Sequence, residues 1–125
     1  MLVDTDVLIF NQRGNERAAD WLDSHPRFFL SAVTWMELVQ GARNKAELRT
    51  LRQALRFWGA EIKPINEEIS ARAMFWLEEF ALGNGLRMAD ALIAASAWYL
   101  GKPLVTANIR QYRFIEEIEL IGFKP

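Results

Sequence analysis

The sequence contains no cysteine and a single histidine among its 125 residues. The missing cysteine excludes thiolate catalysis and cysteine-type zinc sites. The histidine, His25, lies in the segment SHP, which is typical of a turn at the surface, so a Ser–His–Asp triad is not expected. Carboxylates are therefore the natural candidates for metal ligands in this chain.

Long hydrophobic runs and an excess of positive charge are also missing. The longest apolar run, in ADALIAASAWYLG, is shorter than the roughly 20 residues that a membrane span needs. The first residues lack the basic region of a signal peptide, so we expect a cytoplasmic protein that does not contact a membrane. The net charge is −1, so any binding of nucleic acid must come from a local basic patch. No linker or repeat is visible, which predicts one domain over residues 1–125.

Short apolar strands alternate with helical segments along the chain, and this alternation predicts an α/β domain with a parallel sheet of four to five strands. Binding sites in such sheets form at the carboxyl ends of the strands, which is where Asp4 follows the first one. We expect strands at 1–3, 27–31, 60–65, 102–106 and 118–122. We expect helices at 5–10, 16–24, 32–43, 45–59, 67–85 and 88–101, with the last of them in a central position.

Three acidic residues stand in segments that otherwise resemble a hydrophobic core: Asp4 in MLVDTDVLIF, Glu37 in VTWMELV and Asp90 in RMADALIAASA. Burying a charge costs several kcal/mol unless it is compensated. Carboxylates that lie close together also raise each other's pKa. A hard divalent cation such as Mg²⁺ or Mn²⁺ relieves this repulsion and can activate a water for attack on a phosphodiester.

Each acid also has a purely structural explanation. Asp4 or Asp6 could cap the helix that follows the first strand. Thr34 and Glu37 fit the spacing of a capping box, and Asp90 could lie in the first turn of its helix, where the helix dipole favours it. Both explanations stay open for each acid taken singly. Their shared placement at strand ends or helix starts favours a common site.

Four segments, LVDTDVLI, SAVTWMELVQGA, MADALIAASA and LVTANIRQY, resemble the PIN-domain nucleases in their order and spacing, and within them the VapC-type toxins of toxin–antitoxin pairs. The resemblance covers essentially the whole chain. It implies a PIN-like three-layer α/β/α fold and a Mg²⁺- or Mn²⁺-dependent endoribonuclease. It also implies a homodimer, an RNA substrate and a VapB-type antitoxin as partner.

By this resemblance the catalytic and metal-binding acids are Asp4, Glu37 and Asp90, with Asp6 as a further candidate ligand. The last family motif usually carries an acid before an aromatic residue, whereas Gln111 stands there in this chain. This departure puts a second metal ion in doubt. We expect five polar side chains to orient the carboxylates and their waters: Thr5, Ser31, Thr34, Thr106 and Asn108.

Two groups of arginines are candidate contacts for RNA phosphates or for an antitoxin segment docked as a helix. Arg49, Arg52 and Arg56 share one face of the helix at 45–59, where a merely solvated face is the alternative interpretation. Arg110 and Arg113 follow the last motif and are close to the proposed site in sequence.

Two other functions compete with the nuclease hypothesis. The segment LVDTDV also resembles the first motif of haloacid-dehalogenase-type phosphatases, in which Asp4 would be the nucleophile and Asp6 the acid/base. Lys102 is misplaced for that family, and LVTANIRQ lacks its paired acids. The second competitor is a PIN-shaped binding module with weak or no catalysis. The missing fourth acid favours such a module, and the three retained acids oppose it.

Overall fold

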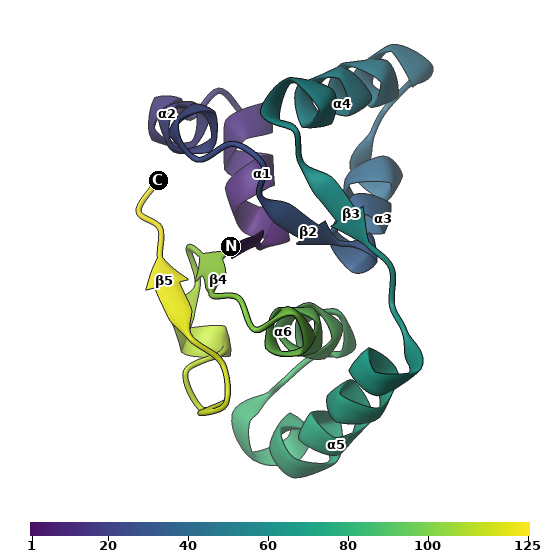
Figure 1. Cartoon of the computed structure of the whole chain (residues 1–125), viewed down its shortest axis with the longest axis vertical. Coiled ribbons are helices and arrows are strands. Elements are labelled where there is room, and N and C mark those ends of the chain that lie inside the picture. Colours follow the sequence, from purple (N-terminus) through teal and green to yellow (C-terminus); the bar gives the residue numbers. More distant parts are fainter.

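The computed structural model describes all 125 residues and places a parallel sheet between two layers of helices (Figure 1). The sheet has five strands in the order β3-β2-β1-β4-β5, and all neighbouring pairs are parallel. The strands are β1 (Leu2–Val3), β2 (Phe29–Ser31), β3 (Glu61–Lys63), β4 (Leu104–Thr106) and β5 (Leu120–Gly122). The predicted α/β architecture is confirmed, and the predicted fifth strand is present.

Six α-helices and one short 3₁₀ helix connect these strands. The helices are α1 (Thr5–Gln12), α2 (Glu16–Ser24), α3 (Ala32–Gly41), α4 (Lys45–Trp58), α5 (Glu67–Asn84), α6 (Met88–Leu100) and η1 (Ile109–Gln111). Each helix begins within a few residues of its predicted start. None is long and apolar enough to cross a membrane.

The two faces of the sheet belong to two separate hydrophobic cores. Successive strand residues point to opposite faces. Leu2 and Leu104 accordingly join the core formed with α5 and α6, whereas Val3 and Val105 join the core formed with α1, α2 and α4. All four side chains are fully buried. Strands this short stay in place because both faces are covered, as is usual for parallel sheets.

Helix α4 contributes the predicted apolar stripe to the core that it shares with α1 and α2. Leu51, Leu55 and Trp58 are buried in it, while Leu48 is only partly covered. The helix ends at Gly59, whose φ of 64° lies in the left-handed region that glycine adopts without strain. Glycine thus lets the chain reverse directly into β3.

Helix α6 lies directly against the opposite face of the sheet, and α5 covers α6 from outside (Figure 1). The predicted central position of α6 is confirmed. Its buried side chains are mostly small, among them Ala91, Ala94 and Ala95, so the helix can approach the strands closely. A helix that is apolar on all sides is expected to be enclosed in this way.

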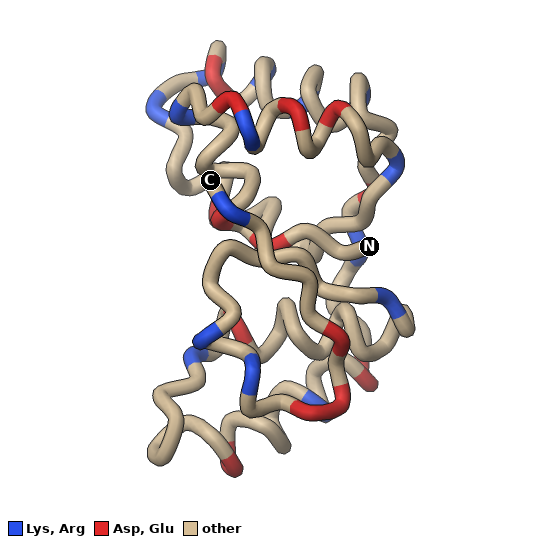
Figure 2. Tube along the Cα trace, turned by 90° about the vertical axis from the view of Figure 1, so that its left-hand side faces the viewer, with Lys and Arg blue, Asp and Glu red and all other residues tan.

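The carboxyl edge of the sheet gathers several helix starts. The chain passes from β1 into α1 through Asp4 and from β2 into α3 through Ser31, each of which caps the helix that follows. In the side view the N-terminus lies near mid-height of the molecule, and the C-terminus lies nearer the end that carries α4 (Figure 2). Polar side chains that follow the strands therefore converge at one edge.

Candidate active site

Asp4 is buried at the end of β1, with 5% of its surface exposed. Its Oδ1 accepts a hydrogen bond from the backbone N–H of Thr5 at 2.8 Å. Its Oδ2 accepts from the hydroxyls of Thr106 at 2.8 Å and Tyr112 at 3.0 Å. Asp4 therefore caps α1 with one oxygen and presents the other to groups that follow β4.

Tyr112 joins Asp4 to the start of α6. Its side chain is fully buried, and its hydroxyl lies 3.2 Å from Oδ1 of Asp90 as well as 3.0 Å from Oδ2 of Asp4. Sequence reasoning did not identify this residue as part of the site. The signals available were the aromatic position in the last motif and the need of a buried tyrosine hydroxyl for a polar partner.

Asp6 lies in the first turn of α1 and faces the end of β4. Its Oδ2 accepts from the backbone N–H of Ala107 at 3.0 Å and from the Thr106 hydroxyl at 3.2 Å. Its Oδ1 is buried and has no hydrogen-bond partner. A buried carboxylate oxygen without a donor is costly, so this oxygen is a vacant acceptor beside Asp4.

Glu37 reaches the same edge from α3. Its Oε1 accepts from the Thr5 hydroxyl at 2.7 Å, and that hydroxyl is also hydrogen-bonded to Thr34 Oγ1 at 2.9 Å. The capping-box interpretation of Thr34 and Glu37 is wrong, because α3 begins at Ala32 and is capped by Ser31. Glu37 lies in the middle of α3 and is exposed to solvent. Its carboxylate is held by the hydroxyl of Thr5 in α1.

The polar residues expected to orient the carboxylates have different placements. Thr5, Thr34 and Thr106 belong to the hydrogen-bonded network described above. Ser31 is hydrogen-bonded to no carboxylate, and its hydroxyl oxygen accepts from the backbone N–H of Val33 at 3.1 Å. Asn108 is exposed, and its backbone N–H donates to the Thr106 hydroxyl at 3.0 Å. Asn108 thus orients Thr106 through its backbone and not through its amide side chain.

Burial and nearby negative charges raise the pKa values of Asp4, Asp6 and Asp90, so these three acids hold protons more tightly than usual. Burial, and then the negative charge of Asp6, raise the pKa of Asp4 to about 7. Burial is also the largest cause that raises the pKa values of Asp6 and Asp90. The charge of Asp90 adds to the rise at Asp6, and the charge of Glu37 adds to the rise at Asp90. The four acids therefore interact electrostatically as one group.

The carboxylate oxygens at this edge are the kind of ligand that a hard cation prefers, but few of them are placed close together. No group of three acidic or histidine side chains is arranged as a ready-made metal cluster. Mg²⁺, however, keeps several of its waters and uses as few as one or two protein carboxylates. The unpartnered Oδ1 of Asp6 and the buried carboxylate of Asp4 are oxygens of the kind that such a cation binds.

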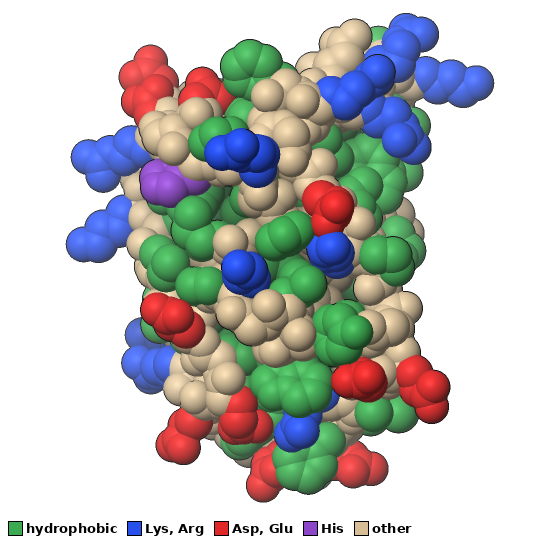
Figure 3. Space-filling model, in the orientation of Figure 1, with side chains coloured by type: hydrophobic (Ala, Val, Ile, Leu, Met, Phe, Trp, Pro, Cys, Tyr) green, Lys and Arg blue, Asp and Glu red, His purple; other side chains and the backbone are tan.

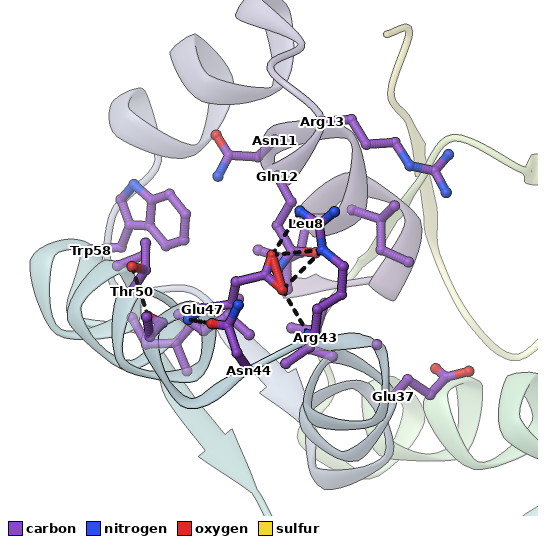
Figure 4. A pocket seen from close by; sticks show the side chains of 18 residues that line it. Leu8, Asn11, Gln12, Arg13, Glu37, Arg43, Asn44, Glu47, Thr50 and Trp58 are labelled. Carbon is purple, nitrogen blue, oxygen red and sulfur yellow. Dashed lines mark hydrogen bonds and ion pairs between the residues drawn. The ribbon is translucent and has the colours of Figure 1, made fainter.

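A groove of 820 Å³ runs between α1, α3 and α4 beside this site. Its apolar lining includes Leu8, Leu38 and Leu51. An ion pair between Arg43 and Glu47, with 3.1 Å between its charged atoms, lies in the groove. Glu37 lies at the edge of the groove (Figure 4). The groove therefore leads from an apolar surface to one of the candidate catalytic acids.

Basic side chains gather over α4 on the outer surface of the molecule (Figure 3). Arg49, Arg52 and Arg56 are all exposed there, and the guanidinium of Arg52 lies 4.9 Å from the centre of the Trp35 ring. Arg49 and Arg56 form no ion pair. Arg110 and Arg113 are exposed at η1 and just beyond it. Both arginine groups are available to an external ligand.

The fold and the position of the acids define an α/β/α sandwich with a carboxylate site at the carboxyl edge of a parallel sheet. The family model described as PIN domain matches residues 1–116. The chain belongs to the PIN-domain family. The family assignment and the fold exclude the haloacid-dehalogenase alternative.

The chain is similar to a named ribonuclease and to proteins of toxin–antitoxin structures. Ribonuclease VapC10 of Mycobacterium tuberculosis is 32% identical over 123 residues, which cover 95% of this chain and 90% of that protein. A toxin–antitoxin complex from Klebsiella pneumoniae contains a chain that is 28% identical, with a TM-score of 0.80 over 97% of this chain and 95% of that one. FitAcB from Neisseria gonorrhoeae is 27% identical, with a TM-score of 0.74 over 97% and 96% of the two chains.

We expect the Asp4→Asn variant to change how stability depends on pH in metal-free buffer. The pKa of Asp4 is raised on folding, so the folded protein binds the proton more tightly and the parent loses stability as pH rises from about 4 to about 7. The variant lacks this loss. The free energy of unfolding of the variant, relative to that of the parent, should therefore rise by roughly 4 kcal/mol as pH increases across this window. This figure uses about 1.4 kcal/mol for each pKa unit.

Urea unfolding at a series of pH values, with a chelator present, measures this difference. Asp20→Asn changes an exposed acid on α2 and is the matched control. A difference between the Asp4→Asn variant and the parent that stays constant from pH 4 to pH 8 would contradict the assignment of Asp4 as a strained, buried acid.

Proposed function

We propose that the protein is a metal-dependent endoribonuclease toxin that is neutralised by a VapB-type antitoxin. The observation that carries the proposal is the hydrogen-bonded network of acids at the carboxyl edge. Asp4, Asp6 and Asp90 are linked there through Thr106 and Tyr112. The name of the ribonuclease relative, at 32% identity over 95% of this chain, supports the reaction. The toxin–antitoxin neighbour at 28% identity supports the kind of partner.

In this proposal Asp4, Asp90 and Glu37 hold Mg²⁺ or Mn²⁺, with Asp6 as an additional ligand. The bound cation would lower the pKa of a water and offset the negative charge that develops on the phosphate. Thr106 fixes Asp4, and Thr5 fixes Glu37, so that these carboxylates keep their orientation before RNA arrives. Preorganised donors and acceptors are a main source of catalytic power in such sites.

The groove beside Glu37 is the proposed place for the antitoxin. Its apolar lining and its length along α4 fit an amphipathic helix better than a nucleic acid. A partner in this groove would end beside the catalytic acids, which accounts for inhibition without a change of fold. A homodimer also remains a prediction.

The alternative of a PIN-shaped binding module has one specific observation in its favour. Gln111 supplies no negative charge where the family motif usually has an acid, and its side chain is exposed. Cleavage itself distinguishes the two functions, because a binding module would hold RNA without cutting it.

We expect the purified protein to cut cellular RNA with Mg²⁺ or Mn²⁺ and to stop when a chelator is added. The Asp4→Ala variant should lose at least about 100-fold in rate, because the carboxylate at the centre of the network is removed. Asp20→Ala should cleave as the parent does, since Asp20 is exposed on α2. Sequencing of RNA 5′ ends would identify the sites.

In cells, induction of the parent should arrest growth, and co-expression of a small protein encoded beside it should relieve the arrest. The nuclease proposal fails if the parent cuts no cellular RNA with either metal and if inducing the parent is as harmless as inducing Asp4→Ala. RNA binding without cleavage would instead establish the binding module.

The arginines of α4 give a separate prediction about the ligand surface. Arg49 and Arg56 make no ion pair, so changing both to Gln should weaken RNA or antitoxin binding without loss of stability. For single-stranded RNA, the slope of log K against log salt should fall by about 0.7 for each phosphate contact removed. Fluorescence anisotropy at several salt concentrations measures both effects.

The control is a double variant with the same loss of charge, Arg17→Gln with Lys102→Gln. These exposed residues lie on α2 and just before β4. If the two double variants show equal affinities and salt slopes for both ligands, the basic face of α4 is simply solvated.

A further inference from the structure

The hydroxyl of Tyr112 is the one group of the chain that is hydrogen-bonded to both Asp4 and Asp90. The two acids come from distant parts of the chain, since Asp4 follows β1 and Asp90 lies in the first turn of α6. Thr106 reaches Asp4 and Asp6 but not Asp90. This hydroxyl therefore links the β1 and α6 sides of the site directly.

Tyr112 itself has little freedom to move. Its ring is fully buried in the core formed with α5 and α6. Its backbone N–H donates to the carbonyl of Ile109 at 3.0 Å, and its carbonyl accepts from the N–H of Ile115 at 2.9 Å. Further along this segment, Glu117 accepts from the Trp76 indole N–H at 2.9 Å. The buried ring and the backbone hydrogen bonds on either side of Tyr112 therefore restrict where its hydroxyl can lie.

One hydroxyl cannot satisfy two ionised carboxylates. A phenol carries a single proton, so at any moment it donates to Asp4 or to Asp90, and the other carboxylate faces its oxygen lone pairs. The bridge therefore sets the separation of the two acids but leaves one of them without a donor from Tyr112. A cation between the acids would supply the missing positive charge.

We propose that Tyr112 is a positioning residue that holds Asp4 and Asp90 at the separation and orientation required to bind the divalent cation. This inference rests on the proposed function. It also gives a role to the last motif, where Gln111 stands in place of the expected acid. The polar group that reaches the site from this motif is the hydroxyl of Tyr112, the residue that follows Gln111. Groups that orient metal ligands commonly change metal affinity 10- to 100-fold when removed.

The test compares Mn²⁺ binding by the parent, Tyr112→Phe and Tyr99→Phe in the absence of RNA. The chain has two tyrosines, and Tyr99 is exposed near the far end of α6, so its variant loses the same hydroxyl outside the site. Phenylalanine fills the ring space of Tyr112. We expect Tyr112→Phe to bind Mn²⁺ at least about tenfold more weakly by calorimetry, and Tyr99→Phe to bind as the parent does.

A residue that only packs the core would give a different result. Tyr112→Phe would then bind Mn²⁺ with the affinity of the parent, whatever happened to its melting temperature, and that result would overturn the inference. Tighter binding would overturn it as well. If the parent binds no Mn²⁺ at all, the proposed function and the role of Tyr112 both fail. If only the Tyr112→Phe result is unchanged from the parent, the role of Tyr112 fails alone, so the two failures are distinguishable.

A second measurement does not depend on the folding of Tyr112→Phe. In the Tyr99→Phe protein, Tyr112 is the only remaining tyrosine. Ring-labelled tyrosine then gives a single set of NMR signals. Addition of Mg²⁺ should shift them, because the cation changes the charge on the two carboxylates that the hydroxyl bridges. Signals that do not move while Mg²⁺ binds would contradict the role of Tyr112.

Discussion

The burial of three neighbouring carboxylates, one almost completely and two in part, is the constraint on which the candidate site depends. Asp4, Asp6 and Asp90 lie where the sheet, α1 and α6 meet, and burial raises the pKa of each. The fold tolerates them because hydroxyls and backbone N–H groups donate to most of their oxygens. The compensation is incomplete, since one oxygen of Asp6 has no donor. Binding a proton or a cation would relieve the negative charge that remains at this site.

The architecture explains why the acids are where they are. Parallel strands end at one edge of the sheet, and helices begin there. Asp4 shows that capping and site chemistry are not alternatives, because one oxygen caps α1 and the other faces Thr106 and Tyr112. The short strands are held by two cores, one on each face. A rigid sheet between the cores lets residues far apart in sequence keep hydrogen-bond distances.

Local patterns predicted the elements of the fold well, because strand alternation and helix periodicity are properties of neighbouring residues. Asp4, Glu37 and Asp90 were recognisable since each is a charge in an apolar segment, and the structure brings them to one edge. Tyr112 was missed because its hydroxyl meets Asp4 across 108 positions of sequence, which no local pattern records. Ser31 has a local role as the cap of α3, and its expected role beside the carboxylates stays a prediction.

Thermal melting with and without Mn²⁺ tests most directly whether these acids form a metal site. The account predicts that the parent melts higher as Mn²⁺ is added, because a ligand of the native state stabilises it. Asp90→Asn, which relieves repulsion, should melt at least as high as the parent without metal and lose most of the rise with it. Asp20→Asn, at an exposed acid of α2, should respond as the parent does. A parent that Mn²⁺ does not stabilise, or an Asp90→Asn protein with the full response, would contradict the account.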